Sequence, residues 1–199
     1  MSIIKLADAQ SEFENVESAF GEVKAYGVTK FVPLTDPVLL QLPTMTAPFG
    51  FSQFDVNSKL SMPLNVSEQS DQSLLTVIDT WAMDQICMNS VEWLGRKNAS
   101  QDYVEAIYTP LLKPATNARY SPTFKLTIPD TYKHTGVTVD SRAPGTYKFH
   151  RVTAIVQIRG LWVASGKCGL STQLKLMQVE EPAPQAQVEM IEDDLELVI

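Results

Sequence analysis

Two alternating stretches near the end of the chain predict a long β-hairpin over residues 152–179. Apolar residues recur at every second position in both stretches, which is typical of a strand with one buried face. The predicted inward positions are Val152, Ala154, Val156, Ile158 and Trp162 in the first strand and Leu170, Thr172, Leu174 and Leu176 in the second. Gly166 and Gly169 lie between the stretches, where a tight turn needs backbone conformations that glycine adopts readily. We therefore expect a hairpin with an apolar inner face and a polar, partly basic outer face.

The same period of two predicts further strands upstream of the hairpin. Apolar and polar residues alternate over 59–66 and again over 124–128. The proline-rich stretch 31–42 favours extended chain or an edge strand, because proline cannot donate a hydrogen bond to a neighbouring strand. Weaker signals predict a strand near 136–139 and the entry to a strand at 147–149.

Two helices are predicted between the strands. Apolar residues over 75–93 recur at three- and four-residue spacing, which predicts a long helix capped by Ser70 and stopped by Gly95. A shorter helix capped by Ser100 is predicted over 101–108. Two helices for at least five strands favour a mainly β fold, and the leading candidate is an OB-fold-like Greek-key barrel with inserted helices.

The chain has a net charge of −7, and its charged residues are unevenly distributed along the sequence. Seven of the 23 acidic residues lie from Glu180 onward, where no basic residue occurs, so positions 1–179 carry 16 acidic and 16 basic residues. The 199 residues, with 44% hydrophobic content, predict a single core. We therefore expect an N-terminal extension over 1–44, a barrel domain over 45–179 and a disordered acidic tail over 180–199.

Composition also sets the expected compartment. No apolar run approaches the roughly 20 residues of a membrane helix, and the N-terminus is acidic rather than a basic leader. Cys87 and Cys168 are expected to be buried thiols, because two cysteines without a CxxC pattern indicate neither a zinc site nor a disulfide framework. We expect an intracellular, non-secreted protein without a membrane partner.

The sequence offers no recognisable catalytic signature. No GxxxxGK[ST], GxGxxG, HExxH or GxSxG pattern occurs, and the two histidines, His134 and His150, lie in turn-rich stretches. Asp193 and Asp194 form a carboxylate pair in the tail, whereas acid–base catalysis needs fixed geometry. We expect a protein that is not an enzyme and that uses no metal or cofactor.

A binder of single-stranded nucleic acid needs cations for the phosphates and exposed aromatic rings on which bases stack. Strand outer faces, turns and the segment after the long helix supply both residue types. The candidate nucleic-acid-binding residues are Arg96, Lys97, Lys113, Tyr120, Lys125, Tyr147, Lys148, Arg151, Arg159, Lys167 and Lys175. Alternating basic residues on a strand usually form only a solvated face, and Trp81, Phe124 and Trp162 are expected in the core.

The acidic tail adds to the nucleic-acid hypothesis. A mobile polyanion can imitate a nucleic-acid strand, occupy a basic groove weakly, and give way when phosphates arrive. It can also present a peptide to partner proteins, or serve only to keep the protein in solution.

Five segments in order resemble a known family: 47–50, 89–97, 108–113, 120–126 and 160–171. They resemble a family of proteins of large DNA viruses of eukaryotes that is similar to the phage-type single-stranded DNA-binding proteins, which have an OB-fold barrel and an acidic C-terminal tail. The hairpin departs from that pattern with Cys168 and Ser171-Thr172, where an aromatic residue and a tryptophan are expected.

The resemblance implies an accessory protein of viral DNA replication and recombination that coats exposed single strands in the host nucleus or at a cytoplasmic viral replication site. Its expected partners are single-stranded DNA, replication proteins that contact the tail, and further copies of itself in a homo-oligomer. The alternative is a virion structural or minor capsid protein that uses the barrel for protein contacts, and the neutral charge of positions 1–179 favours this alternative.

Overall fold

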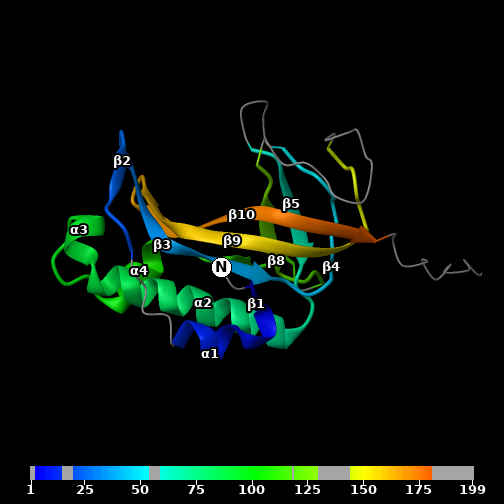
Figure 1. Cartoon of the computed structure of the whole chain (residues 1–199), viewed down its shortest axis with the longest axis horizontal. Coiled ribbons are helices and arrows are strands. Elements are labelled where there is room, and N and C mark those ends of the chain that lie inside the picture. Colours follow the sequence, from blue (N-terminus) through cyan, green and yellow to red (C-terminus); the bar gives the residue numbers. More distant parts are fainter. Residues whose placement is uncertain (1–2, 15–19, 54–58, 118, 130–143, 181–199) are drawn as a thin grey trace, which may run out of the picture.

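The computed structural model describes residues 3–14, 20–53, 59–117, 119–129 and 144–180 (Figure 1). The predicted strand near 136–139 and the acidic tail beyond Glu180 lie outside these residues. The strands are β1 (Ile3–Lys5), β2 (Lys24–Tyr26), β3 (Thr29–Gln41), β4 (Met45–Thr46), β5 (Ser61–Asn65), β6 (Tyr108–Thr109), β7 (Leu112–Lys113), β8 (Thr123–Thr127), β9 (Arg151–Ala164) and β10 (Lys167–Glu180). The helices are η1 (Leu6–Asp8), α1 (Ala9–Glu14), α2 (Gln69–Met88), α3 (Ser90–Leu94) and α4 (Gln101–Ile107).

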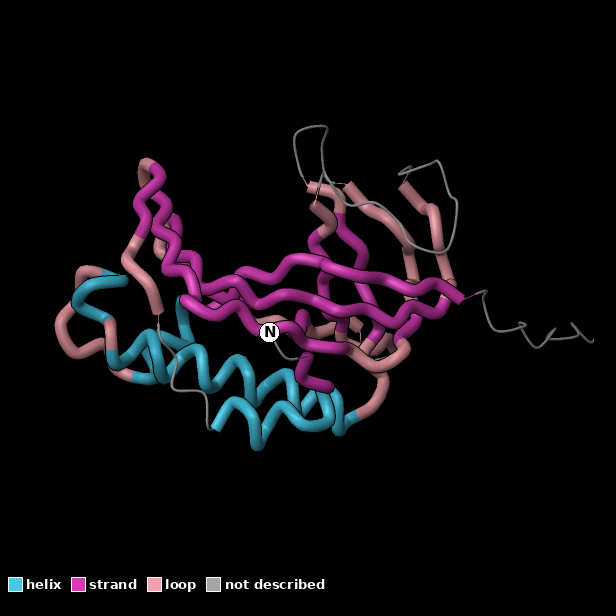
Figure 2. Tube along the Cα trace, in the orientation of Figure 1, coloured by secondary structure: helices cyan, strands magenta, loops and turns pink. Residues whose placement is uncertain are grey.

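The strands form one mixed sheet that bends around a core, and helices cover one side of it (Figure 2). Strand β9 pairs with β10 along one edge, and with β3 and then β4 along the other. From β4 the sheet continues through β5 and β8 to β7, while β10 pairs with β6. Only Pro110 and Leu111 separate β6 from β7, so residues 108–113, here called the strap, join the two ends of the sheet.

The sheet is open beside the strap. Among the described strands, β8 pairs with β5 and β7 and has no ladder with β10. The expectation of a mainly β fold with inserted helices is confirmed. The predicted extended chain at 31–42 is present as β3, but β3 lies between β9 on one side and β1 and β2 on the other, so it is not an edge strand. A register shift between Pro33 and Val38 accommodates its prolines.

Helix α2 packs its apolar stripe against the sheet. Leu75, Ile78, Ala82 and Ile86 are buried, as the three- and four-residue spacing predicts. The predicted single helix is two helices, because Asn89 leaves the helical conformation between α2 and α3. In the part of the chain that the structure describes, no helix has both the length and the apolar character needed to cross a membrane.

Helix ends follow the predicted caps in part. Helix α3 ends at Gly95, whose φ of 68° is left-handed, as the predicted stop requires. The Ser100 hydroxyl accepts a hydrogen bond from the Tyr103 amide and caps α4 as expected. Helix α2 begins earlier than predicted, and its N-cap is Glu68 rather than Ser70.

The predicted C-terminal hairpin is present as β9 and β10, but two β-bulges change which residues face inward. Arg159 is an extra residue in β9 and Lys175 is an extra residue in β10. Each extra residue reverses the inward and outward alternation beyond it. Leu176, predicted to be inward, is therefore 44% exposed, whereas Met177 is buried.

The predicted strand entry at 147–149 is a turn, and the strand that follows it, β9, begins at Arg151. Tyr147 and Phe149 have φ values of 65° and 63°, which no strand accommodates. Backbone hydrogen bonds from Phe51 to Thr146 and from Phe149 to Ala47 hold this turn against residues 47–51.

Candidate nucleic-acid interface

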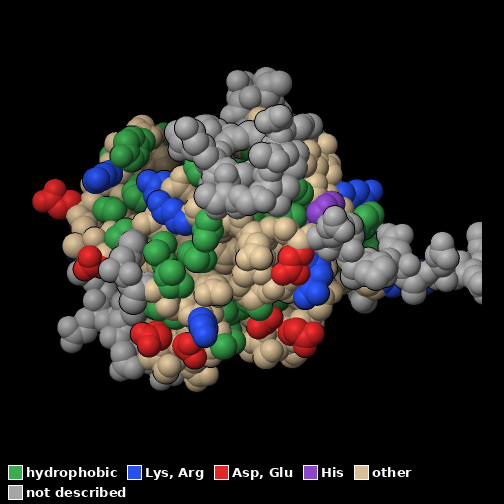
Figure 3. Space-filling view, turned by 45° about the vertical axis from the view of Figure 1, so that its right-hand side comes forward, with side chains coloured by type: hydrophobic (Ala, Val, Ile, Leu, Met, Phe, Trp, Pro, Cys, Tyr) green, Lys and Arg blue, Asp and Glu red, His purple; other side chains and the backbone are tan. Residues whose placement is uncertain are grey.

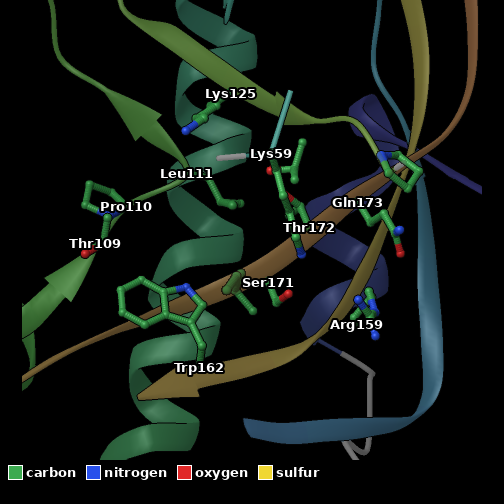
Figure 4. Close-up of a pocket in the computed structure, with 13 residues that line it drawn as sticks. Lys59, Thr109, Pro110, Leu111, Lys125, Arg159, Trp162, Ser171, Thr172 and Gln173 are labelled. Carbon is green, nitrogen blue, oxygen red and sulfur yellow. The ribbon is translucent and has the colours of Figure 1, made fainter. Parts of the chain in front are cut away.

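A groove of about 310 Å³ lies where the sheet is open, between β8, β10 and the strap (Figure 4). Side chains from five parts of the fold converge on it: the residue before β5, the strap, the β8 region, β9 and β10. The lining residues are Lys59, Thr109, Pro110, Leu111, Lys125, Thr127, Pro129, Arg159, Trp162, Leu170, Ser171, Thr172 and Gln173. Because the strap closes only one side, the groove is open to ligands from the other.

Three cations line this groove. Lys59 precedes β5, Lys125 projects from the outer face of β8, and Arg159 is the bulged residue of β9. Among the described lining residues there is no aspartate or glutamate. Like charges held close together without carboxylates create a positive potential, which attracts phosphate groups.

Trp162 contributes the aromatic surface of the groove. The bulge at Arg159 places Trp162 on the same side as Arg159, so its predicted place in the core is wrong, and it is half-buried at the groove instead. Gly169 is its partner on β10. A Cβ at position 169 would lie 3.1 Å from Cζ2 and 3.2 Å from Nε1 of the indole, so glycine leaves the room that the indole occupies.

Gly160 makes this bulge possible. Its φ of 148° is one that side-chain-bearing residues rarely adopt, and a Cβ there would overlap the Val32 carbonyl oxygen. A larger residue would move β9 away from β3, and Arg159 and Trp162 would move with it.

A buried carboxylate holds the strap from the helix side. Asp79 of α2 is 4% exposed and accepts hydrogen bonds from the Tyr108 hydroxyl at 2.8 Å and from the Leu111 amide at 3.0 Å. Burial raises the pKa of Asp79 from 3.8 to about 6, although both hydrogen bonds favour the ionised form. Burial, followed by the charge of Asp79, also raises the pKa of Tyr108. Asp79 therefore positions the strap that forms one wall of the groove.

The two sides of the strap differ in charge. A cavity of about 240 Å³ on the helix side is lined by Asp79, Glu105 and Tyr108, together with Thr76, Met83, Pro110 and Leu112. The opposite side is the groove with its three cations. The strap thus separates an acidic helix side from a basic sheet side.

The structure brings together two of the predicted site residues, Lys125 and Arg159, in the groove. Lys113 of β7 pairs with Thr123, so it lies on the same face of the sheet as Lys125. Lys167 is exposed at the start of β10, and Lys175 is exposed at the second bulge. These five residues belong to the sheet.

None of the other predicted residues lines the groove, and of these only Arg151 belongs to a strand, as the first residue of β9. The Arg96 guanidinium lies 4.0 Å from the ring centroid of Tyr103, and Lys97 is exposed in the same loop after α3. Lys148 lies 4.9 Å from the ring centroid of Phe149. Arg151 is 4.0 Å from the Glu180 carboxylate, and both side chains are about half exposed.

The two predicted tyrosines differ in exposure. Tyr120 is 70% exposed before β8, where its ring is accessible for stacking. Tyr147 is 5% exposed and packs against Phe51 and His150, so its ring is not presented to solvent.

Sequence reasoning missed Lys59, Trp162 and the role of the strap as a wall of the groove, although 108–113 is one of the five segments that carry the resemblance. Lys59 was an outward position of a predicted strand, so the alternation that placed it could also have named it as a candidate. Trp162 was hidden by the bulge, for which Gly160 inside a strand pattern was the available signal. Comparison with models of known protein families and with curated proteins finds no match for this chain.

Proposed function

We propose that this protein binds single-stranded DNA without sequence specificity and acts in DNA replication and recombination without being an enzyme. The observation that carries the proposal is the groove that Lys59, Lys125, Arg159 and Trp162 line together, with no aspartate or glutamate among its described lining residues. Cations that follow the backbone, combined with a ring on which bases stack, are the recurring means of binding single strands.

Each part of the groove has a role in this proposal. Phosphates lie near the three cations, and their binding releases counterions and makes affinity depend on salt. A base stacks on the Trp162 indole, which accepts any base because every base has a flat face. Contacts to phosphates and ring faces carry little sequence information, so the expected binding is indifferent to sequence.

We also propose that the bent sheet is an opened relative of the OB-fold barrel. Five strands follow one another around the core in the order β10, β9, β4, β5 and β8, and the strap lies where a closed barrel would have a ladder between β8 and β10. OB-folds bind oligonucleotides on such a strand face.

The acidic tail is part of the same proposal. Its seven carboxylates, counted from Glu180, would compete with phosphates for the groove. A chain that ends at Glu180 keeps β10 complete and should bind oligo-dT more tightly than the full chain at low salt. Equal affinity of the two chains would remove the tail from the proposal and leave the groove in place.

Charge reversal in the full-length protein tests the groove. The double variant Lys125→Glu with Arg159→Glu should lose about 100-fold in affinity for a labelled oligo-dT, or about 2.7 kcal/mol, measured by fluorescence anisotropy at low salt. Both side chains are exposed, so the free energy of unfolding of the double variant should stay within about 0.5 kcal/mol of the wild-type value. Lys5→Glu is the control, since Lys5 lies on β1 and lines a different pocket.

The outcome separates the proposal from the virion structural alternative. If wild type binds the oligonucleotide and the double variant does not, the groove is the binding site. If wild type does not bind at low salt, or if Lys5→Glu weakens binding as much as the double variant does, the groove proposal fails.

A further inference from the structure

A row of directly paired residues crosses five strands and passes through the groove. Lys24 of β2 pairs with Phe31 of β3, Phe31 pairs with Trp162 of β9, Trp162 pairs with Gly169 of β10, and Gly169 pairs with Thr109 of β6. Residues paired directly across strands project from the same face of a sheet. Lys24 and Phe31 therefore share a face with the indole that lines the groove.

A second row lies two residues further along the strands. Tyr26 follows Lys24 by two positions and Lys167 precedes Gly169 by two, so both project from this same face. Tyr26 is 64% exposed, and Lys24 and Lys167 are also exposed. Figure 1 shows the β2–β3 hairpin projecting away from the helices, next to the turn that joins β9 to β10.

The helices cover the opposite face of these strands. Val32, Leu161 and Cys168, each next to a residue of the first row, are buried. Lys30 also projects to that side, where its Nζ donates to the backbone carbonyls of Glu92 and Trp93. The face that carries Phe31 and Tyr26 thus points away from the helices.

Arg159 links the groove to this face. Its guanidinium carbon lies 5.7 Å from the ring centroid of Phe31, within the range of a cation–π contact, while Arg159 also lines the groove. Cations and rings therefore alternate from the groove outward, in the order Arg159, Phe31, Lys24 and Tyr26. None of the residues in the two rows is acidic.

We propose that the bound single strand leaves the groove at Trp162 and continues over Phe31 onto the β2–β3 hairpin, where Lys24, Tyr26 and Lys167 contact it. The inference rests on the proposed function and defines the extent of its site. Neighbouring strands are about 4.8 Å apart, so β2 lies roughly 10 Å from β9 and the hairpin lengthens the site by that much. A longer oligonucleotide reaches these residues and a very short one does not.

The test compares two oligonucleotide lengths on the full-length protein. Oligo-dT of about 5 and about 15 nucleotides spans the usual range of site sizes for one such fold. The double variant Lys24→Ala with Tyr26→Ala should bind the longer oligonucleotide about tenfold more weakly and the shorter one as wild type does. Its salt slope for the longer oligonucleotide should fall by about 0.7, the share of one phosphate contact.

Two further variants complete the design. Lys167→Glu, on the neighbouring turn, should also weaken only the longer oligonucleotide, which gives an independent check if the hairpin double variant does not fold. Val28→Ser is the matched control, because Val28 is 86% exposed at the hairpin turn and belongs to neither row. It should leave both affinities unchanged.

The outcomes separate this inference from the function on which it rests. If the hairpin double variant and Lys167→Glu bind the longer oligonucleotide as wild type does, the path over the hairpin is wrong while the groove remains the site. The path would also be wrong if the control Val28→Ser weakened binding of the longer oligonucleotide as much as the hairpin double variant does. If wild type binds neither length, the proposed function itself fails.

Discussion

The sheet and the helix layer of this protein carry opposite charge. The basic residues of the described strands are Lys5, Lys24, Lys30, Lys113, Lys125, Arg151, Arg159, Lys167 and Lys175, against Asp36 and Glu180 as acidic ones. The described helices contain Asp8, Glu12, Glu14, Asp71, Asp79, Asp84, Glu92, Asp102 and Glu105 and no lysine or arginine. In the face shown in Figure 3, acidic side chains gather toward the lower edge, where Figure 1 places the helices.

This difference explains why net charge is a poor guide here. Positions 1–179 are neutral only because a basic sheet and an acidic helix layer cancel in the sum. A nucleic-acid strand is attracted by the local electrostatic potential of the face that it contacts and not by the net charge of the protein. The neutral sum, which favours a structural protein when taken alone, is thus compatible with a face that attracts nucleic acid.

The helix side is expected to stabilise the strap, and the sheet side is expected to bind the nucleic acid. Asp79→Ala should destabilise the strap most strongly, because the buried Tyr108 hydroxyl and the Leu111 amide would lose their acceptor. The expected loss is about 3 kcal/mol of unfolding free energy at pH 5, measured by urea denaturation. Glu105→Ala, an exposed neighbour on α4, is the control and should change stability by less than about 0.5 kcal/mol.

Stability should fall as pH rises through the range in which Asp79 ionises. The pKa of Asp79 is raised from 3.8 to about 6, so its contribution is fully present below 3.8 and is lost as pH rises through about 6. The expected decrease from pH 4 to pH 7 is on the order of 2 kcal/mol. Asp79→Asn cannot ionise and should flatten the profile relative to wild type. Parallel profiles for the two proteins would contradict this assignment.

Trp162→Ala should weaken oligo-dT binding about tenfold, or about 1.4 kcal/mol, because one stacking surface is lost. Trp162→Phe keeps a ring and should recover most of the affinity. Anisotropy gives both values, and quenching of tryptophan fluorescence on binding should shrink in the two variants. Unchanged affinity for Trp162→Ala would mean that the indole only fills space.

Charge reversal on the helix layer should have the smallest effect. Asp84→Lys with Asp102→Lys adds positive charge at exposed helix positions, neither of which lines the groove. Oligo-dT affinity should rise less than about threefold, since screening weakens charges beyond a Debye length of about 8–10 Å. A gain as large as the loss from Lys125→Glu with Arg159→Glu would show that only net charge matters.

Local pattern sufficed for much of the fold. Alternation located the cores of β5, β8, β9 and β10, and the spacing of Leu75, Ile78, Ala82 and Ile86 located α2. These elements are predictable because one face of each is buried, so apolar residues recur along the sequence with the period of the strand or helix.

The groove was less predictable because it depends on interruptions of that period. The bulge at Arg159 turns Trp162 outward, and an uninterrupted alternation assigns that residue to the core. The strap is fixed by Asp79, about 30 residues away in sequence, through bonds that no local pattern encodes. Lys125 and Arg159 were found because each projects from a strand that was itself predicted.

The salt dependence of oligo-dT affinity for the full-length protein tests the central claim most directly. If phosphates lie at Lys59, Lys125 and Arg159, log Kd should rise with log salt concentration with a slope of about 2, since each phosphate contact on a single strand contributes about 0.7. The slope should fall below about 1 in the Lys125→Glu, Arg159→Glu variant. Binding that does not respond to salt, or a slope that the variant leaves unchanged, would contradict the claim that this groove is the nucleic-acid site.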